Sequence, residues 1–208
     1  MFGKSWTLVG GQMVFLHQIE RSSTEVRPTD DVDVVVDLRA EPGALRRIHQ
    51  VLRDAGFSQH SPGADGVAHR YGRGAALLDV LAPDNLGAKS NLKIGGGRTI
   101  AASGSTQAIR RTSEVLVRIG NEAGPVRRPD VVGALLGKCA AVTKIVSQTT
   151  AGRLKHLGDL DALALLLGPD DRRDADLSKS ERKALRRILA LGELSPLAEA
   201  SVDLLIQP

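Results

Sequence analysis

The chain has 208 residues, of which 42% are hydrophobic, 25% charged and 2% aromatic, with a formal net charge of +4 at pH 7. This size supports one substantial core, with or without a helical extension packed beside it. Its single cysteine, Cys139, cannot form an internal disulfide, and no apolar run approaches the roughly 18 residues of a membrane-spanning helix. The N-terminus has no basic leader before a small-residue cleavage site, so we expect a cytoplasmic protein that does not enter the membrane.

The first elements are a strand, a glycine turn and a helix. Residues 6–9 form a short apolar run that ends at Gly10-Gly11, and the apolar residues from Met13 to Ile19 then have helical spacing. A second strand is predicted over residues 32–38, which are mostly apolar and β-branched, as in strands buried on both faces.

The middle of the chain alternates between helix, hairpin and loop. Pro42 begins a predicted helix that continues through Leu52 and ends before Gly56. Residues 67–71 and 75–81 flank Gly72-Arg73-Gly74 and predict a hairpin. Residues 86–112 are rich in small residues and predict loops with one or two strands, in which Gly95-Gly96-Gly97 is a flexible turn; residues 115–119 suggest further sheet.

The last third of the sequence is helical. Pro125 and Pro129 mark a boundary, and Ser178 followed by Glu181 is a capping box. Helices are predicted over residues 131–149, 153–167, 178–191 and 196–205. We therefore predict the α+β class, with an α/β domain over residues 1–124 that has a mixed sheet with flanking helices, and a C-terminal helical bundle over residues 125–208.

Asp31 and Asp33 lie two positions apart on a predicted strand, so that both carboxylates point to one face, roughly 7 Å apart. A divalent cation relieves such a pair, since Mg²⁺ is commonly held by one or two carboxylates together with substrate phosphates. The alternative is an exposed strand start, where the pair caps a turn. Asp79 favours the first interpretation, because it lies on another apolar strand, and a buried carboxylate must be paired, protonated or metal-bound.

Two further features of the sequence are typical of phosphate-binding sites. Gly10-Gly11 at a strand-to-helix turn allows the backbone to approach an anion at a helix N-terminus. A basic stretch also extends beyond Asp84, and it is either a track for a phosphate backbone or a solvated surface. Its members are Lys89, Lys93, Arg98, Arg110, Arg111, Arg118, Arg127 and Arg128.

Four motifs resemble those of a known superfamily in the same order along the chain. Three of them lie in the first half: Val9-Gly10-Gly11, Arg27-x-Thr29-x-Asp31-x-Asp33 and Leu78-Asp79-Val80. The fourth is in the second half, where Lys138 lies in a leucine-rich helix and residues 152–160 read G-R-L-K-H-L-G-D-L. This pattern resembles the DNA polymerase-β-like nucleotidyltransferases, and most closely the AbiEii-type toxins of type IV toxin-antitoxin systems, including the MenT-type enzymes. His156 departs from the acidic residue usual at that position.

The resemblance implies a site and an activity. Asp31, Asp33 and Asp79 would bind Mg²⁺ or Mn²⁺, Lys138 would neutralise the triphosphate, and Asp159 would orient Lys138 or Arg153. The catalytic set is then Asp31, Asp33, Asp79, Lys138 and Asp159, and the nucleotide-binding set is Gly10, Gly11, Arg27, Lys138 and Arg153. The enzyme would be a monomeric toxin that transfers a nucleoside monophosphate from an NTP to RNA, at the tRNA 3′ end, and would be controlled by a cognate antitoxin.

Other functions fit the same residues. Transfer to a small molecule of the aminoglycoside type would use the same carboxylates, and a non-catalytic binding or regulatory protein would keep the fold without the chemistry. The resemblance also makes Thr29 a candidate regulatory phosphorylation site, where a phosphate would add negative charge beside the carboxylates; the alternative is that Thr29 caps a turn.

Overall fold

A computed structural model of the chain describes residues 5–24, 26–27, 29–87, 90–145 and 149–207. The strands are β1 (Trp6–Val9), β2 (Asp31–Val36), β3 (Ser58–Gln59), β4 (Arg70–Arg73), β5 (Ala76–Pro83), β6 (Lys93–Ile94), β7 (Gly97–Arg98), β8 (Ala101–Ala102), β9 (Thr112–Ile119) and β10 (Glu122–Pro129). The helices are α1 (Gly10–Glu20), α2 (Ala44–Asp54), α3 (Ser105–Arg110), α4 (Val131–Lys144), α5 (Thr150–Leu165), α6 (Pro169–Arg173), α7 (Lys179–Leu189) and α8 (Pro196–Ile206).

A mixed sheet forms the N-terminal half, in the order β1-β2-β5-β4-β3, with β8 added alongside β5. The pairs β2–β5 and β5–β8 are parallel, and the other pairs are antiparallel. The predicted α+β class with a mixed sheet is confirmed. Because β2 and β5 are parallel neighbours, their residues 31–35 and 77–81 lie side by side.

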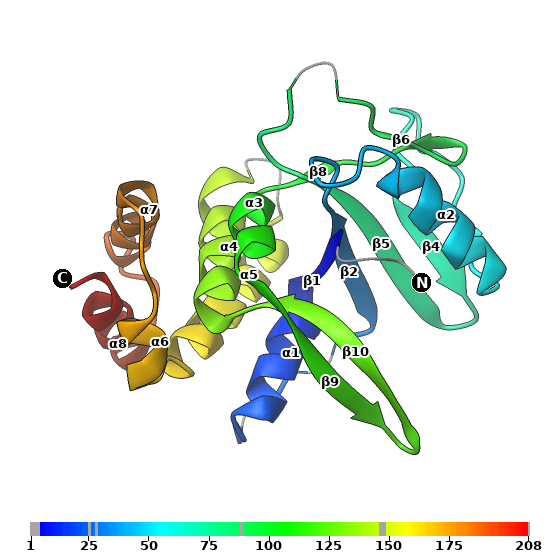
Figure 1. The fold of residues 1–208 in the computed structure, drawn as a ribbon. Coiled ribbons are helices and arrows are strands. Elements are labelled where there is room, and N and C mark those ends of the chain that lie inside the picture. Colours follow the sequence, from blue (N-terminus) through cyan, green and yellow to red (C-terminus); the bar gives the residue numbers. More distant parts are fainter. Residues whose placement is uncertain (1–4, 25, 28, 88–89, 146–148, 208) are drawn as a thin grey trace.

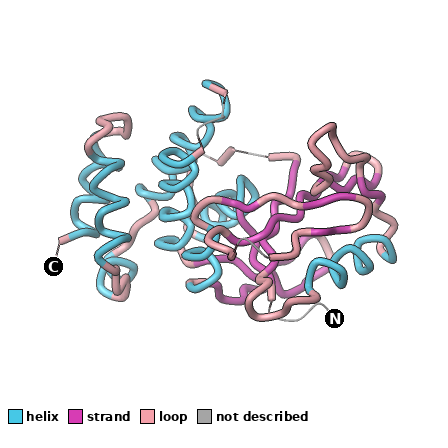
Figure 2. Tube along the Cα trace, turned by 90° about the horizontal axis from the view of Figure 1, so that it is seen from above, coloured by secondary structure: helices cyan, strands magenta, loops and turns pink. Residues whose placement is uncertain are grey.

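The first helices flank this sheet, and the later helices form a layer of their own. In α2, Ala44, Leu45, Ile48 and Leu52 are buried, which is the one-sided spacing of an amphipathic helix. Figure 1 shows α6, α7 and α8 at one end of the molecule, with α4 and α5 between them and the sheet. Seen from above, strands gather on one side and the C-terminal helices on the other (Figure 2). None of the described helices is long and apolar enough to span a membrane.

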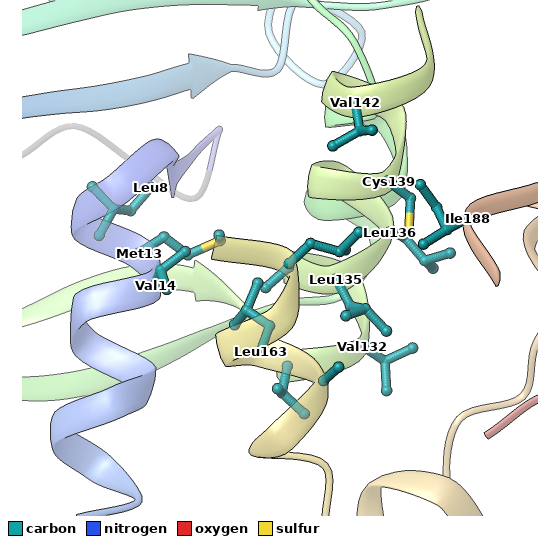
Figure 3. Packing of buried hydrophobic residues seen from close by; sticks show 14 of the residues in the cluster. Leu8, Met13, Val14, Val132, Leu135, Leu136, Cys139, Val142, Leu163 and Ile188 are labelled. Carbon is teal, nitrogen blue, oxygen red and sulfur yellow. The ribbon is translucent and has the colours of Figure 1, made fainter. Parts of the chain in front are cut away.

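The core is continuous across both halves of the chain. One cluster of buried side chains contains Leu8 and Met13 from the N-terminal half together with Leu135, Leu163 and Ile188 from the helical half (Figure 3). The predicted boundary after residue 124 falls inside β10, which pairs with β9 along its whole length. The division into two domains stays a prediction.

Several elements differ from the sequence-based expectations. Helix α3 lies in the stretch predicted as loops and short strands, because the side chain that caps it, Asp84, lies far back in the sequence. Helix α4 ends at Lys144, before the expected residue 149, and residues 146–148 lie outside the described part. Helix α5 begins at Thr150, after a cap in which Gly152 N donates to Thr149 Oγ1. The predicted hairpin is confirmed, but Gly72 and Arg73 belong to β4, so that its turn is Gly74-Ala75. The capping box at Ser178 is also confirmed.

Candidate active site

The sheet register places the predicted carboxylates in one row. Val9 at the end of β1 is opposite Asp33 on β2, Asp33 is opposite Asp79 on β5, and Asp79 is opposite Arg70 on β4. Asp31 lies two residues before Asp33 on the same strand. The expected convergence of β2 and β5 is therefore present, and it comes directly from their parallel pairing.

The glycine turn closes over this row. Gly10 has φ +70°, and a Cβ atom there would lie 1.8 Å from Asp33 Oδ2. A Cβ atom at Gly11 would lie 2.9 Å from Thr29 Oγ1. Both glycines thus allow the start of α1 to approach β2 and the segment before it, and at Gly10 the left-handed backbone conformation also favours glycine.

The three carboxylates have different surroundings. Asp31 Oδ1 accepts a hydrogen bond from Thr29 Oγ1 at 2.7 Å, which puts the candidate phosphorylation site in contact with the carboxylate pair. Asp33 is half-buried, and burial raises its pKa to about 6, helped by the charges of Asp31 and Asp79 and opposed by those of Lys138 and Arg70. The phosphorylation of Thr29 stays a prediction.

Asp79 is 6% exposed and is bound by an arginine. Arg70 Nε donates to Asp79 Oδ1 at 2.8 Å and Arg70 Nη2 donates to Oδ2 at 2.7 Å, while His69 Nε2 lies 3.7 Å from Oδ2. Neither Arg70 nor His69 is among the site residues that the sequence predicts. The predicted turn over Gly72-Arg73-Gly74 does not place positions 70 and 79 opposite each other, whereas the observed turn at Gly74-Ala75 does.

The ion pair between Arg70 and Asp79 affects how the expected metal ion could be bound. Across the residues that the structure describes, no three His, Cys, Asp or Glu side chains are arranged to hold a metal ion together. Asp31 and Asp33 remain as two adjacent oxygen donors, and Asp33 accepts no hydrogen bond from the residues described. Two carboxylates suffice for Mg²⁺ when substrate phosphates complete its coordination, so the donor set fits Mg²⁺ or Mn²⁺ bound together with a nucleotide.

Lys138 belongs to a buried ion-pair group. The side chain is on α4, is 5% exposed, and its Nζ donates to Asp159 Oδ2 on α5 at 2.6 Å. Arg27 Nη2 binds the other oxygen of Asp159. Asp159 therefore contacts Lys138, one of the two partners that the resemblance implied, and the catalytic role of both residues stays a prediction.

Arg153 lies away from this ion-pair group, whereas Arg27 contacts it from outside the carboxylate row. Arg153 is paired with Glu193, at 2.5 Å between Nη1 and Oε2, so that the structure does not bring it to Asp159 or to the carboxylate row. Arg27 lines a different hollow, of about 440 Å³, between α1 and α5.

A cavity of about 320 Å³ opens beside the row, and Gly10, Asp33 and Lys138 line it. His156, on α5, lines it as well; burial and then Lys138 lower its pKa. Most of the wall consists of small or apolar residues, namely Val9, Met13, Leu81, Ile100, Ala101, Ala102, Gly104, Ala108, Gly133, Ala134, Gly137, Ala141 and Ile145. The cavity is thus mostly apolar, and its polar groups are those of Asp33, Lys138, His156, Ser103 and Ser105.

The basic stretch does not form one surface. Arg111 lies 3.8 Å from Asp130 and 3.9 Å from Glu181, and it donates to the carbonyl of Ala175. Arg128 is buried and binds Glu20. Arg127 Nε donates to Trp6 O at 3.2 Å, and Lys89 lies outside the described residues. At least three members of the stretch therefore serve tertiary structure.

Comparisons of the chain with protein-family models, with curated proteins and with solved structures find no match.

Proposed function

We propose that this protein is a metal-dependent nucleotidyltransferase that transfers a nucleoside monophosphate from an NTP to an RNA hydroxyl, with the tRNA 3′ end as acceptor. One observation carries the proposal: the parallel pairing of β2 and β5 puts Asp33 beside Asp79, under the Gly10 turn. Arrest of translation and control by an antitoxin belong to the same proposal.

The triphosphate would lie between the glycine turn and Lys138. The start of α1 offers free backbone N–H groups and the positive end of the helix dipole, and Lys138 supplies a fixed positive charge because Asp159 holds its ammonium group. Asp31 and Asp33 would hold Mg²⁺ or Mn²⁺. When bound, the metal would neutralise phosphate charge and align the α-phosphate with the acceptor.

The nucleoside would enter the apolar cavity. Its wall offers contacts to the faces of a base without aromatic stacking, and Asp33 and Lys138, which also line it, would face the phosphates. Apolar pockets with a few placed polar groups are typical of small-molecule sites.

The reaction would then be a displacement at the α-phosphorus. The acceptor oxygen forms a bond to phosphorus, the bond from phosphorus to the pyrophosphate oxygen breaks, and pyrophosphate leaves with its electron pair. Asp79 would take the proton of the acceptor hydroxyl, and Arg70 would hold that carboxylate in position through both of its oxygens.

The test is incubation with each α-labelled NTP, total tRNA and Mg²⁺ or Mn²⁺, followed by a denaturing gel. We expect labelled RNA from the wild type and a loss of at least 100-fold in Asp33→Asn. The matched control is Asp203→Asn, a carboxylate on α8 that is exposed and remote from the row. Absence of label with all four NTPs, or equal label from Asp33→Asn, would contradict the proposal.

A further inference from the structure

A second hollow, of about 250 Å³, lies between α3, α4 and α7, and we call it the α4–α7 groove. Helix α4 contributes to both hollows: Gly137, Lys138 and Ala141 line the cavity, whereas Ala140 and Lys144 line the groove. Helix α3 does the same through Ala108 on the cavity side and Gln107 on the groove side. The groove therefore lies directly behind the wall of the candidate active site.

Three cationic side chains line the groove: Lys144 at the end of α4, and Lys183 and Arg187 on α7. All three residues are exposed, and none forms an ion pair with a carboxylate of the described residues. Arg187 follows Lys183 by four positions, so the two side chains lie on the same face of α7.

The acidic groups nearby are already engaged. Glu181 also lines the groove, but its Oε2 accepts a hydrogen bond from Ser178 N at 2.8 Å, and its Oε1 lies 3.9 Å from Arg111 Nε. Asp84 interacts electrostatically with Lys144, but its oxygens cap α3 at Gly104 N and Thr106 N. The groove consequently keeps an excess of positive charge.

Gln107 on α3 also lines the groove, and one polar atom of its side chain is unsatisfied. The Oε1 atom of Gln107 is buried and has no hydrogen-bond partner among the described residues. Such an orphaned group is costly, and a ligand that carries a hydroxyl donor would satisfy it once the Gln107 side chain turns this oxygen towards the groove. A phosphate supplies acceptors alone, whereas a ribose supplies the hydroxyl.

We infer that the α4–α7 groove binds the ribose–phosphate backbone of the acceptor RNA, with Lys144, Lys183 and Arg187 on phosphates and Gln107 on a 2′-hydroxyl. The inference rests on the proposed function for the identity of the ligand. It places the bound backbone behind α4, the helix that carries Lys138. Because the 2′-hydroxyl distinguishes RNA from DNA, the groove would favour RNA.

The test is the binding of a fluorescent single-stranded RNA, and of DNA with the same sequence, measured by anisotropy over a salt series. The double variant Lys183→Ala/Arg187→Ala should weaken RNA binding at least tenfold and reduce the slope of log K against log[salt] by about 1.4, as expected when two phosphate contacts on a single strand are lost. The matched control is Arg186→Ala, which removes an exposed cation next to Arg187 that does not line the groove. Gln107→Leu should remove most of the preference for RNA over DNA.

Each outcome of these binding measurements tests a different part of the inference. A double variant that binds RNA with the affinity and salt slope of Arg186→Ala would overturn the groove as an RNA site, even if the wild type transfers nucleotides to RNA. An unchanged RNA preference in Gln107→Leu would overturn the role of Gln107. If the double variant loses RNA binding but the wild type transfers no nucleotide to any RNA, the groove stands and the proposed nucleotidyltransferase activity fails.

Discussion

Asp79 has a counter-ion in the protein itself. A buried carboxylate next to two others needs compensation, and Arg70 provides it through two parallel hydrogen bonds from the neighbouring strand. The Arg70 side chain is 41% exposed, so its own desolvation is limited. Arg70 thus neutralises part of the charge of the acidic row, and a bound metal would add to this neutralisation rather than provide all of it.

Arg70→Gln should therefore make the protein more dependent on divalent cations. We expect the free energy of unfolding without metal to fall by about 1–3 kcal/mol, because a buried acceptor loses its charged partner. Saturating Mn²⁺ should then raise the midpoint of unfolding more in this variant than in the wild type. Urea denaturation with and without Mn²⁺ measures both effects, and Arg46→Gln, an exposed arginine on α2, is the control. Equal metal-induced shifts in all three proteins would show that Arg70 does not substitute for a cation.

The alternation of side chains along a strand was enough to predict that Asp31 and Asp33 share a face, and the apolar neighbours of Asp79 were enough to predict its burial. The partners of charged residues were harder to predict. Arg111 and Arg128 appear in the sequence as members of a basic stretch, but each meets its carboxylate partners in other elements. The charge pattern of a segment carries no information about such partners, so the stretch could not be divided into structural and exposed cations from sequence.

At the level of elements, the long helices and the hairpin were predictable because their periodicity and turn residues are local. Helix α3 was not, since its N-terminal cap comes from Asp84 and its first residue follows Gly104, at φ +80°. The two-stranded sheet of β9 and β10 was only partly predicted from the sequence. Pro125 reads as a boundary but lies within β10, opposite Leu116, in a two-stranded ribbon.

Helix α1 is attached to β10 through a buried histidine. His17 is 1% exposed, and its Nε2 lies 3.1 Å from Pro129 O and 3.4 Å from Arg128 Nη1. Burial, followed by the charge of Arg128, lowers the pKa of His17 from 6.5 to about 3. The neutral ring, with Nε2 as donor to the Pro129 carbonyl, is the form that suits this site.

The pH dependence of stability follows from this shift. Between pH 6.5 and 3 the unfolded chain binds a proton at His17 that the folded chain does not. The stabilising contribution of His17 is therefore complete above pH 6.5 and is lost as the pH falls towards 3, with a slope of at most about 1.4 kcal/mol per pH unit. Urea denaturation across this range should show a shallower loss for His17→Gln than for the wild type, while His60→Gln, at an exposed position, keeps the wild-type slope. Parallel curves for all three proteins would contradict this account.

At the level of the whole molecule, one core cluster joins the N-terminal and helical halves, which favours cooperative unfolding. Leu8 and Met13 pack in the same cluster as Leu135 and Leu163, so neither half can lose its packing without exposing apolar surface of the other. Trp6, the only tryptophan, lies on β1 and is partly buried against this cluster, so its fluorescence reports on the N-terminal half. Far-UV circular dichroism reports mainly on the helices, most of which follow residue 130.

We therefore expect the two signals to give the same urea midpoint, as in two-state unfolding. Leu163→Ala, at a position that is 0% exposed on α5, should lower both midpoints together and cost about 2–5 kcal/mol. Leu197→Ala, at a position that is 73% exposed, should leave both close to the wild type. If Leu163→Ala instead shifts the circular dichroism midpoint and leaves Trp6 fluorescence unchanged, the helical half unfolds independently. The division after residue 124 would then describe real domains, and the continuity of the core would not translate into cooperativity.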